Sequence, residues 1–228
     1  MSDQIIDLPA KRLTAGVTKT TRECYEVRDG MRGGEWANIM LNCWSRPVSS
    51  GEGRTDTYYC GEITIQSSHG TWGYIWTACA IPFKEFLCGV GFDYAFGKFM
   101  GSDLKQFDGE GSMHCLRRQL LEGRLHTELS KEEARALWNA LKDREDEVTS
   151  SLNDWVNTLT DIADNLWEDQ HKAAVKMLDE PWELAQTQPK PCAVNFWRDL
   201  WPLFVDALKA EMGVARSSSS SVCPEPCL

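Results

Sequence analysis

Four carboxylates surround the most aromatic and glycine-rich part of this sequence, residues 70–111, and they are the first candidates for chemistry. They are Asp93, Asp103, Asp108 and Glu110. Acids on glycine-rich loops can hold Mg²⁺ or act as an acid–base pair, because hard cations prefer oxygen ligands and loops let several side chains approach one point. The alternative is that Asp93 caps a helix and the other three are solvated. We favour this alternative and assign no catalytic residue; Asp103 and Asp108 belong only to the alternative hypothesis of an enzyme.

Asp56 and Glu62 form a second acidic pair, in the segment TDTYYCGEIT. The pair has a faint similarity to the acids with which restriction-type nucleases bind a metal from neighbouring strand positions. Thr64 stands where such a site needs a lysine, so the usual stabiliser of the transition-state charge is missing. We therefore interpret both acids as solvent-facing strand residues. The alternative function is a metal-dependent nuclease or hydrolase, and its catalytic residues would be Asp56, Glu62, Asp103 and Asp108.

Nine cysteines and four histidines are scattered along the chain without the close paired spacing of a structural zinc site. His114 and Cys115 are adjacent, but Cys115 falls on the apolar face of a predicted helix, where a thiol without a cationic neighbour is inert. An odd number of cysteines without a recognisable signal peptide favours reduced thiols. We expect no metal site and no cofactor.

The formal charge of -10 is concentrated in one segment of the chain. Between Lys131 and Glu183 there are 14 Asp or Glu and 6 Lys or Arg. A broad negative surface disfavours phosphate backbones and favours basic partners, so we expect a protein partner and no direct binding to nucleic acid. No window approaches the ~20 apolar residues of a membrane span, and the N-terminal residues do not form a targeting segment. We therefore expect a cytoplasmic protein without membrane attachment.

A long amphipathic helix is predicted within the acidic segment. Apolar residues recur at spacings of three and four from Val148 to Leu166, a pattern sustained for nearly three heptads. This 148–166 stripe can pack inside one chain or form a homodimer. Five acids lie mainly off the stripe and are the candidate partner-binding residues: Asp154, Asp161, Asp164, Glu168 and Asp169. The alternatives are a solvated helix face and a DNA mimic that inhibits a nucleic-acid-binding enzyme.

Alternating apolar residues predict strands over residues 36–44, 57–66 and 71–77. The turn residues between them favour an antiparallel meander of three to five strands. At Pro82 the period changes to that of a helix, and short helices are predicted from there to about Glu122. The aromatic residues of this region are therefore expected to form a core between the sheet and the helices.

Ser130 and Glu133 predict the start of a further helix, because together they form a capping box. The fold class that follows is α+β, with an N-terminal antiparallel sheet covered by short helices and a mostly α-helical C-terminal extension. Its predicted parts are an α+β domain with an aromatic core at 1–129, an acidic helical region at 130–212 and a disordered tail at 213–228.

The segments SSHGTWGYIWTACAIPFKEFL, YAFGKFMG and LSKEEARALWNAL resemble a group of small phage and prophage proteins, in which an aromatic strand is followed by a Pro-Phe-Lys-Glu-Phe-Leu helix. The resemblance covers roughly residues 55–145. It implies an accessory protein of a bacterial virus that acts in the cytoplasm of the host, and it supplies no catalytic residues. We therefore expect a noncatalytic protein that binds and modulates a host factor through aromatic and acidic surfaces.

Overall fold

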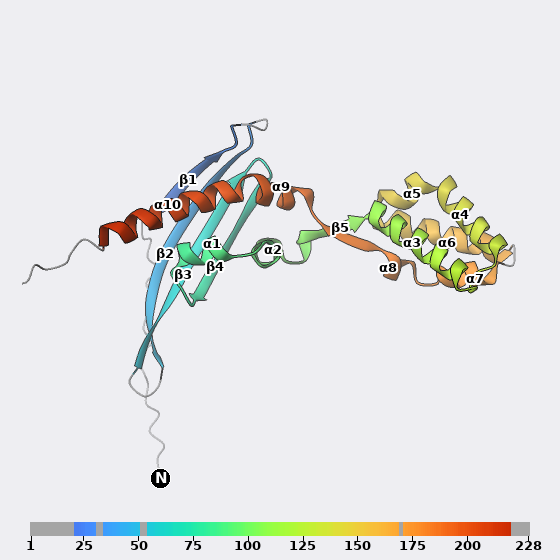
Figure 1. The fold of residues 1–228 in the computed structure, drawn as a ribbon, viewed down its shortest axis with the longest axis horizontal. Helices are drawn as coiled ribbons and strands as arrows, with labels where there is room; N and C mark the ends of the chain where they lie inside the picture. Colours follow the sequence, from blue (N-terminus) through green and yellow to red (C-terminus); the bar gives the residue numbers. More distant parts are fainter. Residues whose placement is uncertain (1–20, 31–33, 51–53, 169–170, 220–228) are drawn as a thin grey trace, which may run out of the picture.

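The computed structural model describes residues 21–30, 34–50, 54–168 and 171–219. Its N-terminal part forms a four-stranded antiparallel sheet in the order β1-β2-β3-β4 (Figure 1). The strands are β1 (Glu23–Arg28), β2 (Trp36–Ser50), β3 (Arg54–Ser67) and β4 (Gly70–Cys79). The predicted α+β class, with an N-terminal antiparallel sheet and a mostly helical remainder, is confirmed.

The two faces of the sheet differ because apolar and polar residues alternate along the strands. Ile39 pairs with Ile65, and Ile65 pairs with Trp72, so three buried side chains line up across the sheet. On the opposite face, Asn38 pairs with Gln66 in the same register. A shift of one residue would exchange these faces, so the alternation specifies the register.

Four helices cover the apolar face of the sheet (Figure 1). They are α1 (Phe83–Gly89), α2 (Phe92–Met100), α9 (Pro191–Asp199) and α10 (Trp201–Ser219). The ring centroid of Trp72 lies 5.1 Å from that of Phe96 on α2 and 5.2 Å from that of Phe196 on α9, in edge-to-face contacts. The C-terminal helices therefore complete the core of the N-terminal sheet.

A charged cluster ties α10 to the sheet and to α1. The Lys84 ammonium lies 2.5 Å from a carboxylate oxygen of Glu23 and 2.7 Å from one of Glu211, and the Tyr25 hydroxyl is 2.8 Å from each acid. Burial raises the pKa of Tyr25. Burial alone would lower the pKa of Lys84, but its hydrogen bonds to the two carboxylates outweigh that effect and raise it. We call these four residues the α10 clasp.

A two-stranded connection leads from the sheet lobe to the rest of the molecule (Figure 1). After the short helix η1 (Gly101–Leu104), strand β5 (Lys105–Asp108) pairs antiparallel with β6 (Gln186–Pro189). The Lys190 N–H extends the pairing by donating to the carbonyl of Leu104 at 2.8 Å. The chain thus leaves the sheet lobe on one strand and returns on the other.

Residues 109–185 form a separate helical lobe at the end of this connection (Figure 1). Its helices are α3 (Gly109–Leu125), α4 (Lys131–Asp143), α5 (Glu145–Ser150), α6 (Leu152–Glu168), α7 (Lys172–Met177) and α8 (Pro181–Leu184). The lobe has its own hydrophobic core, centred on Trp155 and Leu159, which are fully buried. None of the helices in the described ranges is long and apolar enough to cross a membrane.

The two cores group the elements differently from the expected parts 1–129 and 130–212. Helix α3 packs in the helical lobe, whereas α9 and α10 pack on the sheet. Helix α10 also runs on to Ser219, past the expected start of a tail at residue 213, and residues 220–228 lie outside the described ranges. The physical reason is that Phe196 packs against Trp72 of β4 and Phe204 packs against Tyr25 of β1, so the C-terminal helices share the hydrophobic core of the sheet.

Candidate partner-binding surface

The two acids on β3 that could have bound a metal do not converge. Asp56 and Glu62 are six residues apart on one extended strand, which separates them by about 20 Å. Glu62 is engaged by Arg22, whose two terminal nitrogens lie 3.0 and 2.9 Å from its carboxylate oxygens. Asp56 is exposed. Neither geometry is that of a paired metal ligand.

The acids in and after the aromatic segment occupy different structural positions. Asp103 is exposed in η1. Asp108 caps α3, and its Oδ1 accepts a hydrogen bond from the Gly111 N–H at 2.9 Å. We expected Asp93 to cap α2, but it lies in the first turn and the N-cap is Gly91. Within the ranges that the structure describes, no group of three or more His, Cys, Asp or Glu side chains is placed to hold a metal ion.

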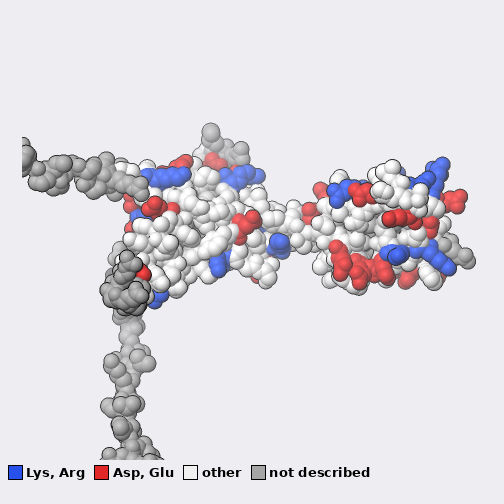
Figure 2. Space-filling model, turned by 60° about the horizontal axis from the view of Figure 1, so that its bottom comes forward, with Lys and Arg blue, Asp and Glu red and all other residues white. Residues whose placement is uncertain are grey.

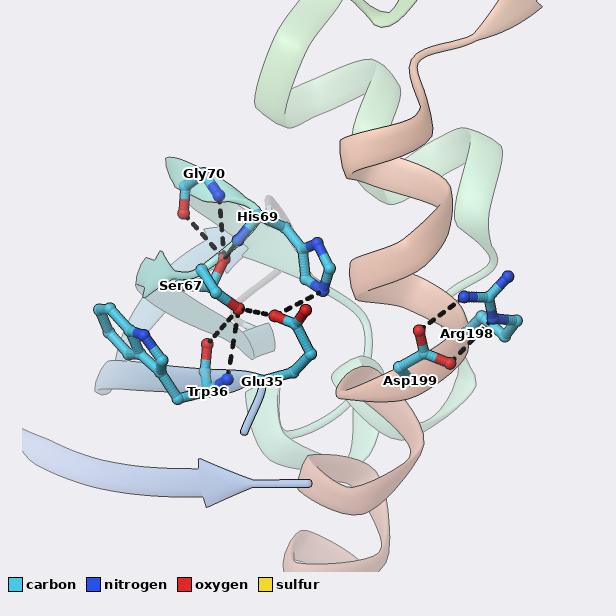
Figure 3. A network of polar contacts seen from close by, with 8 residues as sticks. Glu35, Trp36, Ser67, His69, Gly70, Arg198 and Asp199 are labelled. Atoms are coloured by element: carbon cyan, nitrogen blue, oxygen red, sulfur yellow. Dashed lines mark hydrogen bonds and ion pairs between the residues drawn. The ribbon is translucent and has the colours of Figure 1, made fainter. Parts of the chain in front are cut away.

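A polar network with a histidine and two serines lies at the turn between β3 and β4 (Figure 3). The Ser68 hydroxyl donates to the Glu35 carboxylate, and His69 Nε2 is 3.5 Å from that carboxylate. The Ser67 hydroxyl donates to the Gly70 carbonyl at 2.9 Å and accepts from the Gly70 N–H at 3.2 Å. Among the contacts of the described residues, neither hydroxyl bonds the imidazole ring, so the network closes a turn and does not form a Ser-His nucleophile.

An acidic groove of about 520 Å³ lies between α5 and α6 of the helical lobe. Its charged residues are Arg144, Asp146, Glu147, Asp154 and Asp161. Four carboxylates against one guanidinium give these side chains a net charge of -3. In the space-filling view, Asp and Glu side chains gather along one side of this lobe (Figure 2). The lobe as a whole contains 17 Asp or Glu and 9 Lys or Arg, so it contributes most of the acidity of the chain.

Arg144 links the two helices of the groove. Its Nη2 lies 2.8 Å from a carboxylate oxygen of Glu147 on α5 and 3.4 Å from one of Asp161 on α6. The hydrogen bond to Glu147 and, to a smaller extent, that to Asp161 raise the pKa of Arg144. The groove therefore already accommodates one guanidinium group between carboxylates from two helices.

Asp154 has a structural role at the start of α6. The Ser151 hydroxyl accepts from the Asp154 N–H at 3.1 Å, and the Asp154 carboxylate accepts from the hydroxyls of Ser151 and Ser150 at 2.6 and 2.7 Å. These hydrogen bonds, that of Ser151 first, lower the pKa of Asp154. The carboxylate is consequently ionised and fixed in orientation at the rim of the groove.

A threonine side chain is also part of the groove. Thr158 lines it and is only 4% exposed. Carboxylates and a hydroxyl together are acceptors for ammonium or guanidinium groups.

The position of α5 depends on contacts with α3. Arg117 on α3 makes a two-pronged ion pair with Glu145, at 3.0 and 2.9 Å, which lowers the pKa of Glu145. Val148 on α5 is fully buried in the lobe. The α5 backbone at Thr149 closely approaches Gly109. These contacts hold Asp146 and its neighbours against α6.

Two of the predicted partner-binding residues, Asp154 and Asp161, line the groove. Asp164 and Glu168 are exposed further along α6, and Asp169 lies outside the described residues. Asp146 and Glu147 of the run Glu145-Asp146-Glu147 were not among the predicted residues, because they precede the stripe that was predicted as one continuous helix from Val148 to Leu166. The 148–166 stripe is buried within its own lobe from Val148 to Leu166, except for Leu152. A homodimer through this stripe would have to compete with that packing.

The geometry therefore defines an α+β protein whose sheet lobe carries an acidic helical lobe on a two-stranded connection. In a comparison with protein families, residues 17–210 match a phage family, Phage_phiTE_072, and the chain belongs to this family. The match confirms the phage-type family predicted from the sequence and extends beyond residues 55–145. Comparisons with curated proteins and with solved structures gave no match.

Proposed function

We propose that this phage-family protein is a noncatalytic accessory protein that acts in the host cytoplasm, by binding a basic host protein in the groove between α5 and α6. The observation that carries the proposal is the ligand set of the groove. It combines four carboxylates with the buried side chain of Thr158. Arg144 already pairs with Glu147 and Asp161 of the groove, as we expect an arginine of the partner to do.

The lack of a convergent catalytic set among the described residues supports binding over catalysis. Asp56, Glu62, Asp103 and Asp108 lie on different elements or far apart on one strand. The partner expected for the groove is a protein with clustered Lys or Arg, because opposite potentials accelerate encounter and fix orientation. Binding should weaken as salt rises, since the carboxylates of the groove are mostly exposed.

The test is a comparison between the wild-type chain and a variant with two reversed charges, Asp146→Lys and Asp161→Lys. Each immobilised protein is used to capture proteins from a lysate of the bacterial host, and captured proteins are quantified by mass spectrometry. The purified partner is then titrated against both proteins at two salt concentrations. We expect the double variant to bind at least about tenfold more weakly, because each reversal replaces attraction by repulsion.

The matched control changes the same amount of charge on the sheet lobe, with Glu26→Lys and Asp206→Lys, which are both exposed. This control should bind like the wild type. An equal loss of affinity in both variants would show that binding depends on the net charge of the protein and not on the groove. A partner that binds the groove variant with unchanged affinity would contradict the proposal.

A DNA-mimic version of the proposal rests on a row of acids along one face of α6. Asp161, Asp164 and Glu168 recur at spacings of three and four, which places them on the same side of the helix. In this version the host partner binds DNA, and duplex DNA should displace it from the chain. If the captured partner forms a ternary complex with DNA, the partner is basic but the mimicry is excluded.

A further inference from the structure

The helical lobe has a second groove whose chemistry is opposite to that of the acidic one. It lies between α3 and α4 and has a volume of about 240 Å³. Leu120 and Ala134 are buried at its floor, and Leu121 on α3 and Trp138 on α4 are its exposed apolar side chains. We call it the α3–α4 groove.

Two arginines accompany the apolar side chains. Arg124 and Arg135 both line the α3–α4 groove and are exposed. Neither guanidinium has a hydrogen bond or an ion pair with any residue that the structure describes, although the surrounding lobe has a net charge of -8. Leu125, one turn beyond Leu121, is 79% exposed. Exposed leucines beside free guanidinium groups fit a partner segment that is both apolar and acidic.

The same lobe carries a segment of that composition. Trp182 on α8 is 58% exposed, and it is flanked by Asp179, Glu180 and Glu183. The segment is anchored, because the buried Pro181 accepts a hydrogen bond through its carbonyl from the indole N–H of Trp155 at 2.7 Å. The negative charge of Glu183 raises the pKa of Glu180, so a nearby cation would relieve repulsion between the two acids.

We propose that the α3–α4 groove binds the Asp179–Glu183 segment of a second copy of this chain. Trp182 of one copy packs against Leu121 and Trp138 of the other, and Glu180 and Glu183 face Arg124 and Arg135. A large aromatic side chain on an anchored segment, inserted between apolar side chains and surrounded by paired charges, has the composition of an interface hot spot. The contact joins two different surfaces. If two copies make the contact in both directions, they form a closed dimer; if each pair of copies makes it only once, they form an open oligomer.

Sedimentation velocity over a range of chain concentrations tests this proposal. Wild-type protein should associate, and the association should weaken with salt. Trp182→Ala should weaken self-association at least about tenfold, the loss typical of a hot-spot tryptophan. The matched control is Trp167→Ala on α6, which is exposed to a similar degree, 60% against 58%, and which should associate like the wild type.

Charge exchange between copies makes the test specific. One variant carries Arg124→Glu and Arg135→Glu, and the other carries Glu180→Lys and Glu183→Lys. All four positions are exposed, so circular dichroism should show that both variants keep the wild-type fold. Each variant alone should remain monomeric at concentrations at which the wild type associates, and the equimolar mixture should associate again.

Three results would overturn the proposal. They are a wild-type chain that is monomeric at every concentration, variants that associate like the wild type, and two folded variants that fail to associate when mixed. None of these results bears on the acidic groove between α5 and α6, so the host-binding proposal is tested separately.

Discussion

Gly109, the first residue of α3, determines how closely α3 and α5 approach each other. A Cβ atom added there would lie 2.2 Å from the carbonyl oxygen of Thr149 and 2.7 Å from its Cα. Because these are backbone atoms, they cannot rotate aside. We expect Gly109→Ala to lower the free energy of unfolding by about 1–3 kcal/mol, the usual cost of overpacking, and to displace the α5 side of the acidic groove. Urea denaturation measures the loss.

Gly97→Ala is the control for this prediction. Gly97 lies inside α2, and a Cβ atom there would meet nothing within 4 Å. The substitution should stabilise the chain by about 0.5–1 kcal/mol, because alanine loses less conformational entropy in a helix. If the two variants have the same stability, the close approach of α3 and α5 is not as tight as described.

At the scale of the element, local patterns predicted what depends on near neighbours in the chain. The Ser130–Glu133 capping box is confirmed, with hydrogen bonds of 3.0 and 3.1 Å, because all its partners lie within four residues. The break at Ser151 was missed. The apolar spacing continues from α5 into α6 across that residue, whereas its extended backbone separates the two helices. The groove between α5 and α6 arises at this break. The acidic segment was therefore predictable from the sequence, but the groove within it was not.

The α10 clasp makes the docking of α10 dependent on pH. Replacing Lys84 by Met should lower stability at neutral pH by about 1 kcal/mol, a small value because Glu211 is half exposed. The hydrogen bonds from Lys84 and Tyr25 lower the pKa of Glu211, so its contribution is present above the ordinary Glu pKa and is lost as pH falls through the lowered value. The difference between wild type and variant should therefore shrink in acid.

Denaturation midpoints of wild-type and Lys84→Met protein between about pH 3 and 8 provide the measurement. At alkaline pH the contribution of the clasp to stability changes in the opposite direction, because it is lost as the pH rises. The raised pKa values of Lys84 and Tyr25 mean that their contribution is complete below the ordinary values and declines above them. A stability difference that stays constant down to pH 3 would show that the ion pair to Glu211 contributes nothing.

At the scale of the whole molecule, the placement of the helical lobe depends on one pairing between distant segments. Strands β5 and β6 have four residues each, KQFD and QTQP, and neither shows a strong strand pattern. Their pairing joins residues 105–108 to 186–189, and nothing local specifies a contact over that separation. The sheet and the helices were therefore predictable from the sequence, but the insertion of the helical lobe between β5 and β6 was not.

Because the helical lobe, residues 109–185, is inserted in the chain between β5 and β6, we predict that it can be removed without unfolding the sheet lobe. Asp108 and Gln186 are paired at the end of the connection, so an Asn-Gly turn can replace residues 109–185 and close a hairpin. Because the two cores are separate, the shortened chain should keep the near-ultraviolet circular dichroism of its packed aromatic residues. It should melt in one transition, within about 4–8 °C of the sheet-lobe transition in the full chain.

A second truncation makes this prediction selective. A chain that ends at residue 129 keeps the sheet but loses α9 and α10, and with them the fully buried Phe196, Phe204 and Leu208. It would expose the apolar face around Trp72, and we expect it to aggregate or to lose cooperative melting. If this fragment melts as cooperatively as the shortened chain, the C-terminal helices are not required for the sheet core, and the chain divides near residue 129 instead of at the two-stranded connection.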